Sequence, residues 1–338
     1  MNDIKVSICC QTYNHVNYIE ECLNGFLMQK TNFKFEILLR DDASADGTTE
    51  IVKKYSDKYP DIINPLIYNE NQYQKGVSPF RDNVKRAKGK YIAICEGDDY
   101  WTDSYKLQKQ VDLLEMNSIY GLVYSDIDTV DENNSYLSRK FITQNELAFC
   151  NNFEEFLIYA PFIAPCTWLF RKEFISYEKK NFVVGDLPLL LDISSRSKVY
   201  MIKEVTSNYR ISKNSASHHT DPINNYNFNK GILDIQLYYA TKYKVSSNVL
   251  FKIFIKNFKS NYLNALKFND YDFIKLLNGL INRANGFPFY YNVLVFTFKH
   301  KVIFYLIQII FNFLFLINKL IKNKKKLKVL WFKNILLT

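Results

Sequence analysis

A short apolar run over residues 91–95 stops just before two adjacent carboxylates, Asp98 and Asp99, and this junction strongly constrains the fold. A continuous apolar run flanked by glycines predicts a buried strand of a parallel sheet. The carboxylates then lie just beyond its carboxyl end, where open α/β sheets bind ligands. Because two neighbouring carboxylates repel each other unless a positive charge lies between them, the expected ligand is a divalent cation bound to a diphosphate. The alternative is a solvated Asp-Asp turn.

The N-terminal part of the chain predicts a β-α-β unit. Residues 6–10 and 35–39, which are mainly apolar apart from Ser7 and Glu36, predict two strands, and between them apolar side chains recur at helical spacing over residues 16–27. Asn14 is the predicted N-cap of that helix. A loop over residues 40–48, rich in turn and capping residues, follows the second strand and opens a second helix. The unit contains neither the glycine-rich dinucleotide fingerprint nor a P-loop.

Four motifs follow one another along this frame. They are Thr12-Tyr13-Asn14 after the first strand, residues 41–48 (DDASADGT) after the second, the pair Asp98-Asp99, and residues 106–110 (KLQKQ). With these motifs, the first two-thirds of the chain resembles a family 2 glycosyltransferase of the bacterial surface-polysaccharide type. The resemblance implies an α/β fold of the GT-A kind, a Rossmann-like nucleotide-diphospho-sugar transferase domain.

The resemblance also implies roles for single residues. The second Asp of the loop after the second strand, here Asp42, would accept the imide N–H of uracil in a short, charge-assisted bond. Asp99, with Asp98 beside it, would hold a divalent metal, Mn2+ or Mg2+, on the diphosphate. Asp46 is expected to shape the turn and cap the following helix. The nucleotide-binding residues implied in this way are Thr12, Tyr13, Asn14, Asp42 and Asp98.

Asp186 is the candidate catalytic base. It follows Gly185 and precedes an apolar helix, and the family places its general base in an acidic motif at such a position. In an inverting transfer, this carboxylate takes the proton of the acceptor hydroxyl while the oxygen attacks the anomeric carbon. The alternative interpretation makes Asp186 only the N-cap of the helix. Asp192, a turn and a half later, is the weaker candidate.

Three further segments are expected to be strands. Residues 162–171 predict an edge or bent strand because they contain Pro165. Residues 199–202 and 205–211 predict two short strands that return to the site.

The segment that follows carries basic residues. The family often has a His two residues after the Arg of this segment, but this chain has Ser212 there. If the family's His contacts the metal or the phosphate, this chain must use another residue, with Arg210 or Lys213 as the candidates to pair with the diphosphate, or make no such contact. His218, further along, is as readily explained by a solvated polar loop.

The chain is predicted to have two parts. Residues 1–215 form the GT-A domain, with a nucleotide-binding half over about 1–115 and an acceptor half over 116–215; residues 216–338 form a helical region. Within that region an amphipathic segment near 302–328 has basic residues at both ends, a pattern that disfavours a spanning helix. We expect it to lie on the inner face of the cell membrane, attracted to anionic lipid. The alternative is a helix packed on the protein core.

Composition excludes several other classes. The net charge of +10 is concentrated near the end of the chain, but the aromatic residues there stand in apolar runs, which argues against nucleic acid as a partner. The six cysteines contain no C-x-x-C pair, which favours reduced thiols in a cytosolic protein over a zinc site. Met1 leads directly into the first strand, so no signal peptide is expected.

The sequence therefore predicts a cytoplasmic enzyme, peripheral on the membrane. It would transfer a sugar, with inversion, from a nucleotide diphosphate sugar, UDP-linked by expectation, to a hydroxyl of a glycan or lipid-linked acceptor. A sugar-1-phosphate nucleotidylyltransferase is one alternative, but it would need a glycine-rich loop with a basic residue after the first strand. A non-catalytic, membrane-bound nucleotide-sugar-binding protein is another, but it would have no reason to keep Asp42, Asp98-Asp99 and Asp186 in this order.

Overall fold

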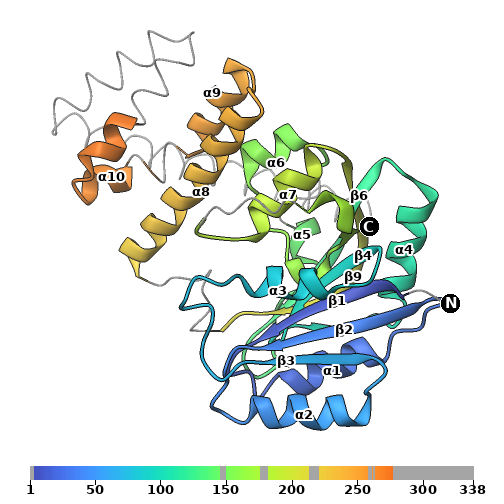
Figure 1. Cartoon of the computed structure of the whole chain (residues 1–338). Helices are drawn as coiled ribbons and strands as arrows, with labels where there is room; N and C mark the ends of the chain where they lie inside the picture. The colour runs from blue at the N-terminus through green and yellow to red at the C-terminus, as the bar shows by residue number, and fades with distance from the viewer. Residues whose placement is uncertain are drawn as a thin grey trace, which may run out of the picture. The chain divides into compact units, whose positions relative to one another are not determined.

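The computed structural model describes residues 4–144, 150–175, 182–212, 221–257, 261 and 263–276. In this part of the chain the strands form one nine-stranded sheet in the order β3-β2-β1-β4-β8-β6-β9-β5, with β7 paired to β6 (Figure 1). The first four strands are parallel, and β8 joins them to the second half of the sheet by antiparallel pairing with both β4 and β6. The strands are β1 (Ile4–Thr12), β2 (Lys34–Asp41), β3 (Ile63–Ile67), β4 (Tyr91–Glu96), β5 (Tyr100–Trp101), β6 (Tyr120–Val130), β7 (Tyr136–Ser138), β8 (Leu169–Arg171) and β9 (Lys198–Arg210).

Helices cover both faces of the parallel half. In Figure 1, α1 and α2 lie below β1, β2 and β3, and α3 lies on the other side of the same strands. This is the layered arrangement that crossover connections between parallel strands produce. The described helices are α1 (Ile19–Leu27), α2 (Thr48–Lys58), α3 (Pro79–Arg86), α4 (Lys106–Met116), α5 (Phe141–Gln144), α6 (Phe153–Tyr159), α7 (Asp186–Ser194), α8 (Pro222–Lys242), α9 (Ser247–Asn257) and α10 (Leu263–Lys267).

The core lies between the central strands and α1. Residues 6–10 of β1 are all buried, as expected of a strand covered on both faces. Phe26 of α1 packs edge-on against Trp101, with ring centroids 4.7 Å apart. Gly25 allows this close approach, because a Cβ there would lie 2.9 Å from the backbone nitrogen of Trp101. Burying each large side chain contributes about 1.5–3 kcal/mol, so this contact firmly fixes α1 against β5.

The predicted β-α-β unit is confirmed, but Asn14 is not the N-cap of its helix. The helix begins at Ile19, after Tyr18, and the carbonyl of His15 accepts hydrogen bonds from the N–H groups of both residues. Asn14 instead has a positive φ of 55°. Asn tolerates this left-handed conformation better than most residues, which lets it turn the chain between β1 and α1.

Two of the later strand predictions also need correction. The two short strands expected near residue 200 form the single strand β9, whose pairing with β6 shifts register between Ser125 and Ile127. Such irregularities bend a strand without ending it. The strand expected over residues 162–171 is only β8, and Pro165 begins a short 3-10 helix, Pro165–Thr167, before it. Proline fits this position because its fixed φ favours a helical turn and its nitrogen cannot donate to a sheet.

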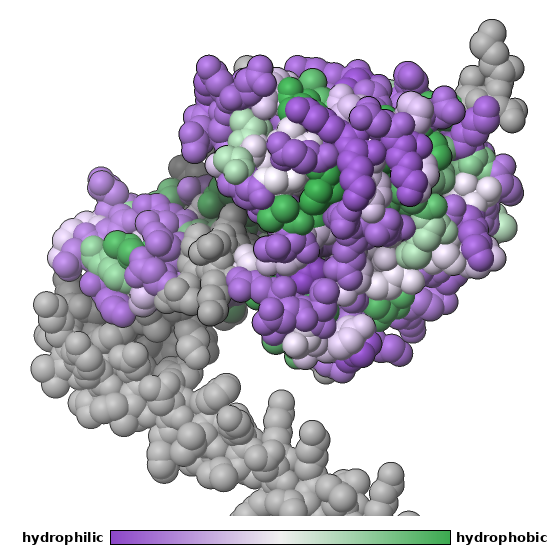
Figure 2. All heavy atoms as spheres, turned by 90° about the horizontal axis from the view of Figure 1, so that it is seen from below, coloured by the Kyte–Doolittle hydropathy of each residue, from purple (hydrophilic) through white to green (hydrophobic). Residues whose placement is uncertain are grey.

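The chain divides into two compact units, Met1–Asn278 and Gly279–Thr338. In the first unit, α8 packs on α6 and α7, and α9 packs on α6. The domain boundary after residue 215 stays a prediction. Among the described helices, none is both long and apolar enough to cross a membrane. The predicted amphipathic segment at 302–328 lies outside the described residues. The underside of the first unit is largely hydrophilic, with apolar residues in scattered patches (Figure 2).

Candidate active site

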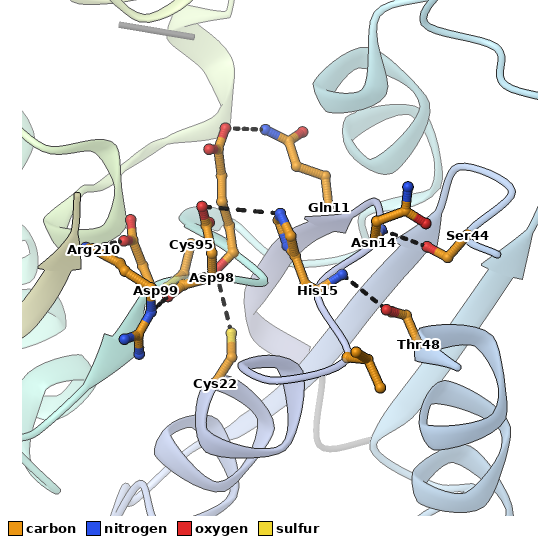
Figure 3. Close-up of polar contacts among 12 residues, drawn as sticks. Gln11, Asn14, His15, Cys22, Ser44, Thr48, Cys95, Asp98, Asp99 and Arg210 are labelled. Carbon is orange, nitrogen blue, oxygen red and sulfur yellow. Dashed lines mark hydrogen bonds and ion pairs between the residues drawn. The ribbon is translucent and has the colours of Figure 1, made fainter. Parts of the chain in front are cut away.

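The register of three parallel strands brings the predicted loops to one edge of the sheet. Thr12 at the end of β1 pairs with Asp41 at the end of β2, and Gln11 pairs with Glu96 at the end of β4. Parallel strands in register end on the same side, so the loops that follow them must be neighbours. The acidic loop after β4 therefore lies beside the Thr12-Tyr13-Asn14 segment (Figure 3).

Asp98 is the more accessible of the two adjacent carboxylates. Its side chain is 29% exposed, and its Oδ2 lies 3.9 Å from Nε2 of His15. Its Oδ1 is buried and has no hydrogen-bond partner among the described residues. A buried, unpaired carboxylate oxygen is costly unless a cation or a donor satisfies it, so Asp98 has the character of a ligand-binding group.

Asp99 is buried and already bonded within the protein. The N–H of Arg210 donates to its Oδ1 at 2.8 Å, and the side chain is only 3% exposed. Burial, and then repulsion from Asp98, raises the pKa of Asp99 well above its usual range. Of the two predicted metal ligands, Asp98 is thus the accessible one, whereas Asp99 is buried and hydrogen-bonded to β9.

Arg210 holds the acidic loop from behind. Its guanidinium donates to the carbonyl oxygens of Asp98 at 2.8 Å and Asp131 at 2.9 Å, and to Oε2 of Glu21 at 3.1 Å. The Cζ atom of Arg210 also lies 4.3 Å from the ring centroid of Tyr18, a cation–π distance. The guanidinium thus binds protein groups. It is not held free to pair with a diphosphate, the role considered for Arg210 from the sequence. Lys213 and His218 lie outside the described residues.

Glu96 is an acidic residue that the sequence reasoning missed. It ends β4, it is exposed, and its Oε1 accepts a hydrogen bond from Nε2 of Gln11 at 2.6 Å. Desolvation by the surrounding protein, and then repulsion from Asp98, raises the pKa of Glu96 to about 7, with a smaller contribution from Asp186. The spacing Glu96-Gly97-Asp98, two carboxylates one residue apart, was the signal available in the sequence.

Asp186 is the first residue of α7, and Gly185 occupies the N-cap position. The Oδ1 of Asp186 accepts a hydrogen bond from the N–H of Leu187, and burial raises the pKa of Asp186. The charge of Asp186 contributes to the raised pKa of Glu96, although less than burial and Asp98 do. Asp192, on the same helix, lies 3.4 Å from Nζ of Lys242 and is thus engaged elsewhere. Gly185, not Asp186, is thus the N-cap residue, although the Asp186 carboxylate still accepts a hydrogen bond from an N–H of the first turn.

Asn14 links the loops after β1 and β2. Its N–H donates to Oγ of Ser44 at 2.9 Å (Figure 3). Its Oδ1 accepts from the N–H of Ala45 at 2.9 Å. The ring of Tyr13 beside it is 45% exposed and available for stacking. Asp46 accepts from both the N–H and the hydroxyl of Thr48, so it holds the turn before α2, whose N-cap residue is Gly47.

Asp42 lies at the predicted nucleotide end but has partners of its own. Its two oxygens accept hydrogen bonds from the N–H groups of Gln72 at 2.8 Å and Tyr73 at 3.0 Å. Nη2 of the buried Arg40 lies 3.2 Å from Oδ1. Asp42 therefore holds the segment after β3 against the loop after β2. Oδ2, which accepts only from Tyr73, keeps a second lone pair, so a bond to a base remains compatible with these contacts.

The exposed carboxylates suit a hard divalent cation. In the part of the chain that the structure describes, no group of three or more His, Cys, Asp or Glu side chains could hold a metal ion. Mg2+ on a nucleotide is typically held by one or two carboxylates and completed by phosphate oxygens and water. Asp98, with its unpaired oxygen, and Glu96, two residues away in the sequence, are the candidates for such a site.

A Rossmann-like sheet with an acidic loop at the ends of its parallel strands is typical of α/β domains that bind nucleoside diphosphates. The family model described as "Glycosyl transferase family 2" matches residues 7–177, half of the chain. The chain belongs to this family, and the family predicted from its motifs is confirmed.

Known relatives agree with this assignment. The chain is 44% identical over 111 residues to an uncharacterised protein of Mycobacterium tuberculosis (32% of this chain, 31% of that protein). It is 29% identical over 150 residues to an Escherichia coli UDP-Glc:alpha-D-GlcNAc-diphosphoundecaprenol beta-1,3-glucosyltransferase, and 33% identical over 134 residues to a putative teichuronic acid biosynthesis glycosyltransferase of Bacillus subtilis. These two alignments cover 44% and 38% of this chain and 55% and 51% of the relatives.

Solved structures show the same fold. Staphylococcus aureus TarS 1–349 in complex with UDP-GlcNAc has a TM-score of 0.61 at 16% identity, over 83% of this chain and 82% of that one. A Pyrobaculum calidifontis mannosyltransferase in complex with GDP-Man and Mn2+ has a TM-score of 0.57 at 16% identity, over 87% and 79%. The predicted α/β sheet of GT-A glycosyltransferases is thus confirmed.

Proposed function

We propose that this protein is an inverting glycosyltransferase that moves a sugar from a nucleotide diphosphate sugar to a hydroxyl group. The observation that carries the proposal is Asp98, a carboxylate with an unpaired buried oxygen, at the sheet edge where α/β domains bind ligands. The acceptor would be a glycan or a lipid-linked saccharide in surface polysaccharide synthesis. The names of the E. coli and B. subtilis relatives support this class of acceptor.

Asp98 and Glu96 would hold the divalent cation, Mn2+ or Mg2+, with the donor diphosphate completing the site. The bound cation would neutralise the charge that develops on the leaving nucleoside diphosphate. Asp99 and Arg210 would keep the loop in place through their mutual hydrogen bond. The TarS complex with UDP-GlcNAc and the mannosyltransferase complex with Mn2+ support a nucleotide sugar and a metal at such a fold.

The nucleoside would lie against the loops after β1 and β2. Tyr13 would stack on the base or ribose with its exposed ring, while Thr12 and Asn14 line the pocket. Asp42 would accept the imide N–H of uracil with a lone pair that its present contacts leave free. The E. coli relative is named for UDP-glucose, which supports a UDP-sugar as donor.

Asp186 would act as the general base. Burial raises its pKa, which brings the carboxylate closer to the pKa that suits proton transfer near neutral pH. It would take the proton of the acceptor hydroxyl while the oxygen forms the new glycosidic bond and the nucleoside diphosphate leaves from the opposite side. This geometry inverts the anomeric centre.

The membrane surface is proposed as a partner of the basic C-terminal region. Residues 302–328 combine an apolar stretch with flanking lysines, and each lysine near an anionic leaflet contributes about 1 kcal/mol of attraction. A chain truncated after Asn278, the end of the first compact unit, should lose binding to anionic vesicles and retain binding of UDP. Equal vesicle binding by both chains would contradict this assignment.

Donor binding and product analysis test the enzymatic proposal. UDP- and GDP-sugars with Mn2+ should raise the melting temperature of the protein by mass action, and one of them should raise it most. With that donor and a saccharide acceptor, release of nucleoside diphosphate is expected. Release of pyrophosphate from a nucleoside triphosphate and a sugar phosphate would instead identify a nucleotidylyltransferase. Tight donor binding without turnover in any acceptor screen would favour the non-catalytic binding protein.

A further inference from the structure

Three buried polar atoms without partners lie around Gly97. They are Oγ1 of Thr12, Nδ1 of His15 and Oδ1 of Asp98, and none of them has a hydrogen-bond partner among the described residues. A Cβ on Gly97 would lie 2.8 Å from Thr12 Oγ1 and 3.0 Å from His15 Nδ1, so both atoms pack directly against this glycine. Native proteins rarely leave buried polar groups unpaired, and a cluster of three at one loop points to a state in which they are paired.

The backbone of His15 is fixed independently of its ring. Its N–H donates to Oγ1 of Thr48 at 2.8 Å, and its carbonyl accepts from the N–H groups of Tyr18 and Ile19, both at 2.9 Å. These bonds place the imidazole between the end of β1 and the acidic loop (Figure 3). A substitution of the side chain leaves all three bonds available, so the role of the ring can be tested without dismantling the loop.

The ring of His15 stands between two of the groups that the proposed function uses. Its Nε2 lies 3.9 Å from Oδ2 of Asp98, within ion-pair range but too far for a hydrogen bond. Its Nδ1 lies on the side of Thr12, whose hydroxyl can donate. Hydrogen bonds in ligand-free sites are often long and tighten only when the ligand arrives.

We propose that His15 is a positioning residue for Asp98, and that a hydrogen-bond chain Thr12–His15–Asp98 closes when the donor diphosphate binds with its cation. The hydroxyl of Thr12 donates to Nδ1 of His15, which fixes the proton on Nε2. The Nε2–H then donates to one oxygen of Asp98 and leaves the other for the cation. Outer-shell partners of this kind orient metal-binding carboxylates and strengthen metal binding. The inference rests on the proposed function, because it requires that Asp98 binds the cation.

Calorimetric titration of UDP, with and without Mg2+, tests the chain in the full-length protein. His15→Ala should weaken the Mg2+-dependent part of UDP binding by about 10- to 100-fold and leave metal-free UDP binding unchanged. His15→Gln, whose amide N–H can reach the position of Nε2–H, should recover part of the loss. Thr48→Val is the structural control: it removes the acceptor of the His15 N–H and should lower the melting temperature without removing the Mg2+ dependence.

Spectroscopy separates positioning from direct coordination. The 15N chemical shifts of His15 should report the Nε2–H tautomer in the complex with UDP and Mg2+, and electron spin echo spectra of the Mn2+ complex should show no coordinated nitrogen. A nitrogen ligand to Mn2+, or unchanged Mg2+ dependence in His15→Ala, would overturn the proposal. If the wild-type protein shows no metal-dependent UDP binding at all, the proposed function fails first, so the two failures are distinguishable.

Discussion

The backbone N–H of Arg210, at the end of β9, donates a hydrogen bond to Oδ1 of Asp99 at 2.8 Å. The guanidinium of the same arginine donates to the carbonyl of Asp98. Arg210 of β9, a strand near one end of the sheet, thereby contacts both Asp98 and Asp99. As a result, two aspartates that are adjacent in sequence have different environments: Asp99 faces the protein, and Asp98 is left partly exposed.

Substitutions of the two aspartates should therefore differ in effect. Asp98→Asn should remove most Mn2+-dependent UDP binding, because it neutralises the exposed carboxylate. Asp99→Asn keeps an oxygen that accepts the Arg210 N–H, and it should change that binding only a few-fold. Titration calorimetry with and without Mn2+ measures both. A loss in Asp99→Asn as large as that in Asp98→Asn would return the metal-binding role to Asp99.

Arg210→Ala should lower the free energy of unfolding by about 3 kcal/mol, because it leaves the partly buried carbonyl groups of Asp98 and Asp131 without these donors. Arg139→Ala is the matched control. The side chain of Arg139 is 60% exposed in its ion pair with Asp128, so its loss should cost about 1 kcal/mol or less. Urea denaturation measures the free energy of unfolding of both variants. Similar losses of unfolding free energy would show that the Arg210 contacts do not stabilise the loop.

Asp186→Asn should reduce kcat by at least about 100-fold and leave the donor Kd unchanged, because a general base contributes to the transition state and little to donor binding. Asp192→Asn, on the same helix, is the control: it faces Lys242 and should retain kcat. Radiolabelled sugar transfer measures turnover. Near-normal kcat in Asp186→Asn would rule out the catalytic role.

Glu96→Gln should stabilise the metal-free protein more at pH 8 than at pH 4.5. The pKa of Glu96 is raised from an ordinary 4.5 to about 7, so the folded protein holds this proton more tightly than the unfolded chain. The resulting stabilisation is present below pH 4.5 and is lost as the pH rises to about 7. Gln stays neutral throughout and still accepts from Gln11. Differential scanning calorimetry checks this, and an equal shift in melting temperature at both pH values would contradict it.

Much of the fold could be predicted from local patterns. The runs that became β1, β2 and β4 are mainly apolar, which predicts central strands, and the polar Ser7 and Glu36 within them are buried as well. The predicted start of α1 at Asn14 was wrong. Asn14 is a favourable N-cap residue by itself, but here it hydrogen-bonds to Ser44 and Ala45 instead. That choice depends on a loop 30 residues away, which no local pattern reports.

Within the candidate site, the sequence predicted the acidic loop but not which of its carboxylates is exposed and which is bonded within the protein. The sequence prediction assigned the metal to Asp99 with Asp98 and passed over Glu96. Burial of Asp99 by β9 and the exposure of Glu96 depend on the register of β4 against β1 and on the crossing of Arg210 over the loop.

The sequence by itself determined the class of protein, because the periodicity of buried runs and the order of four motifs are properties of the chain alone. It determined which loops meet, because parallel strands end on one side of a sheet. Only the tertiary structure decided which carboxylate of the Asp98-Asp99 pair is free and which is bonded to Arg210. The physical reason is that exposure and hydrogen-bond partners are set by residues more than a hundred positions away, and a local pattern carries no information about them.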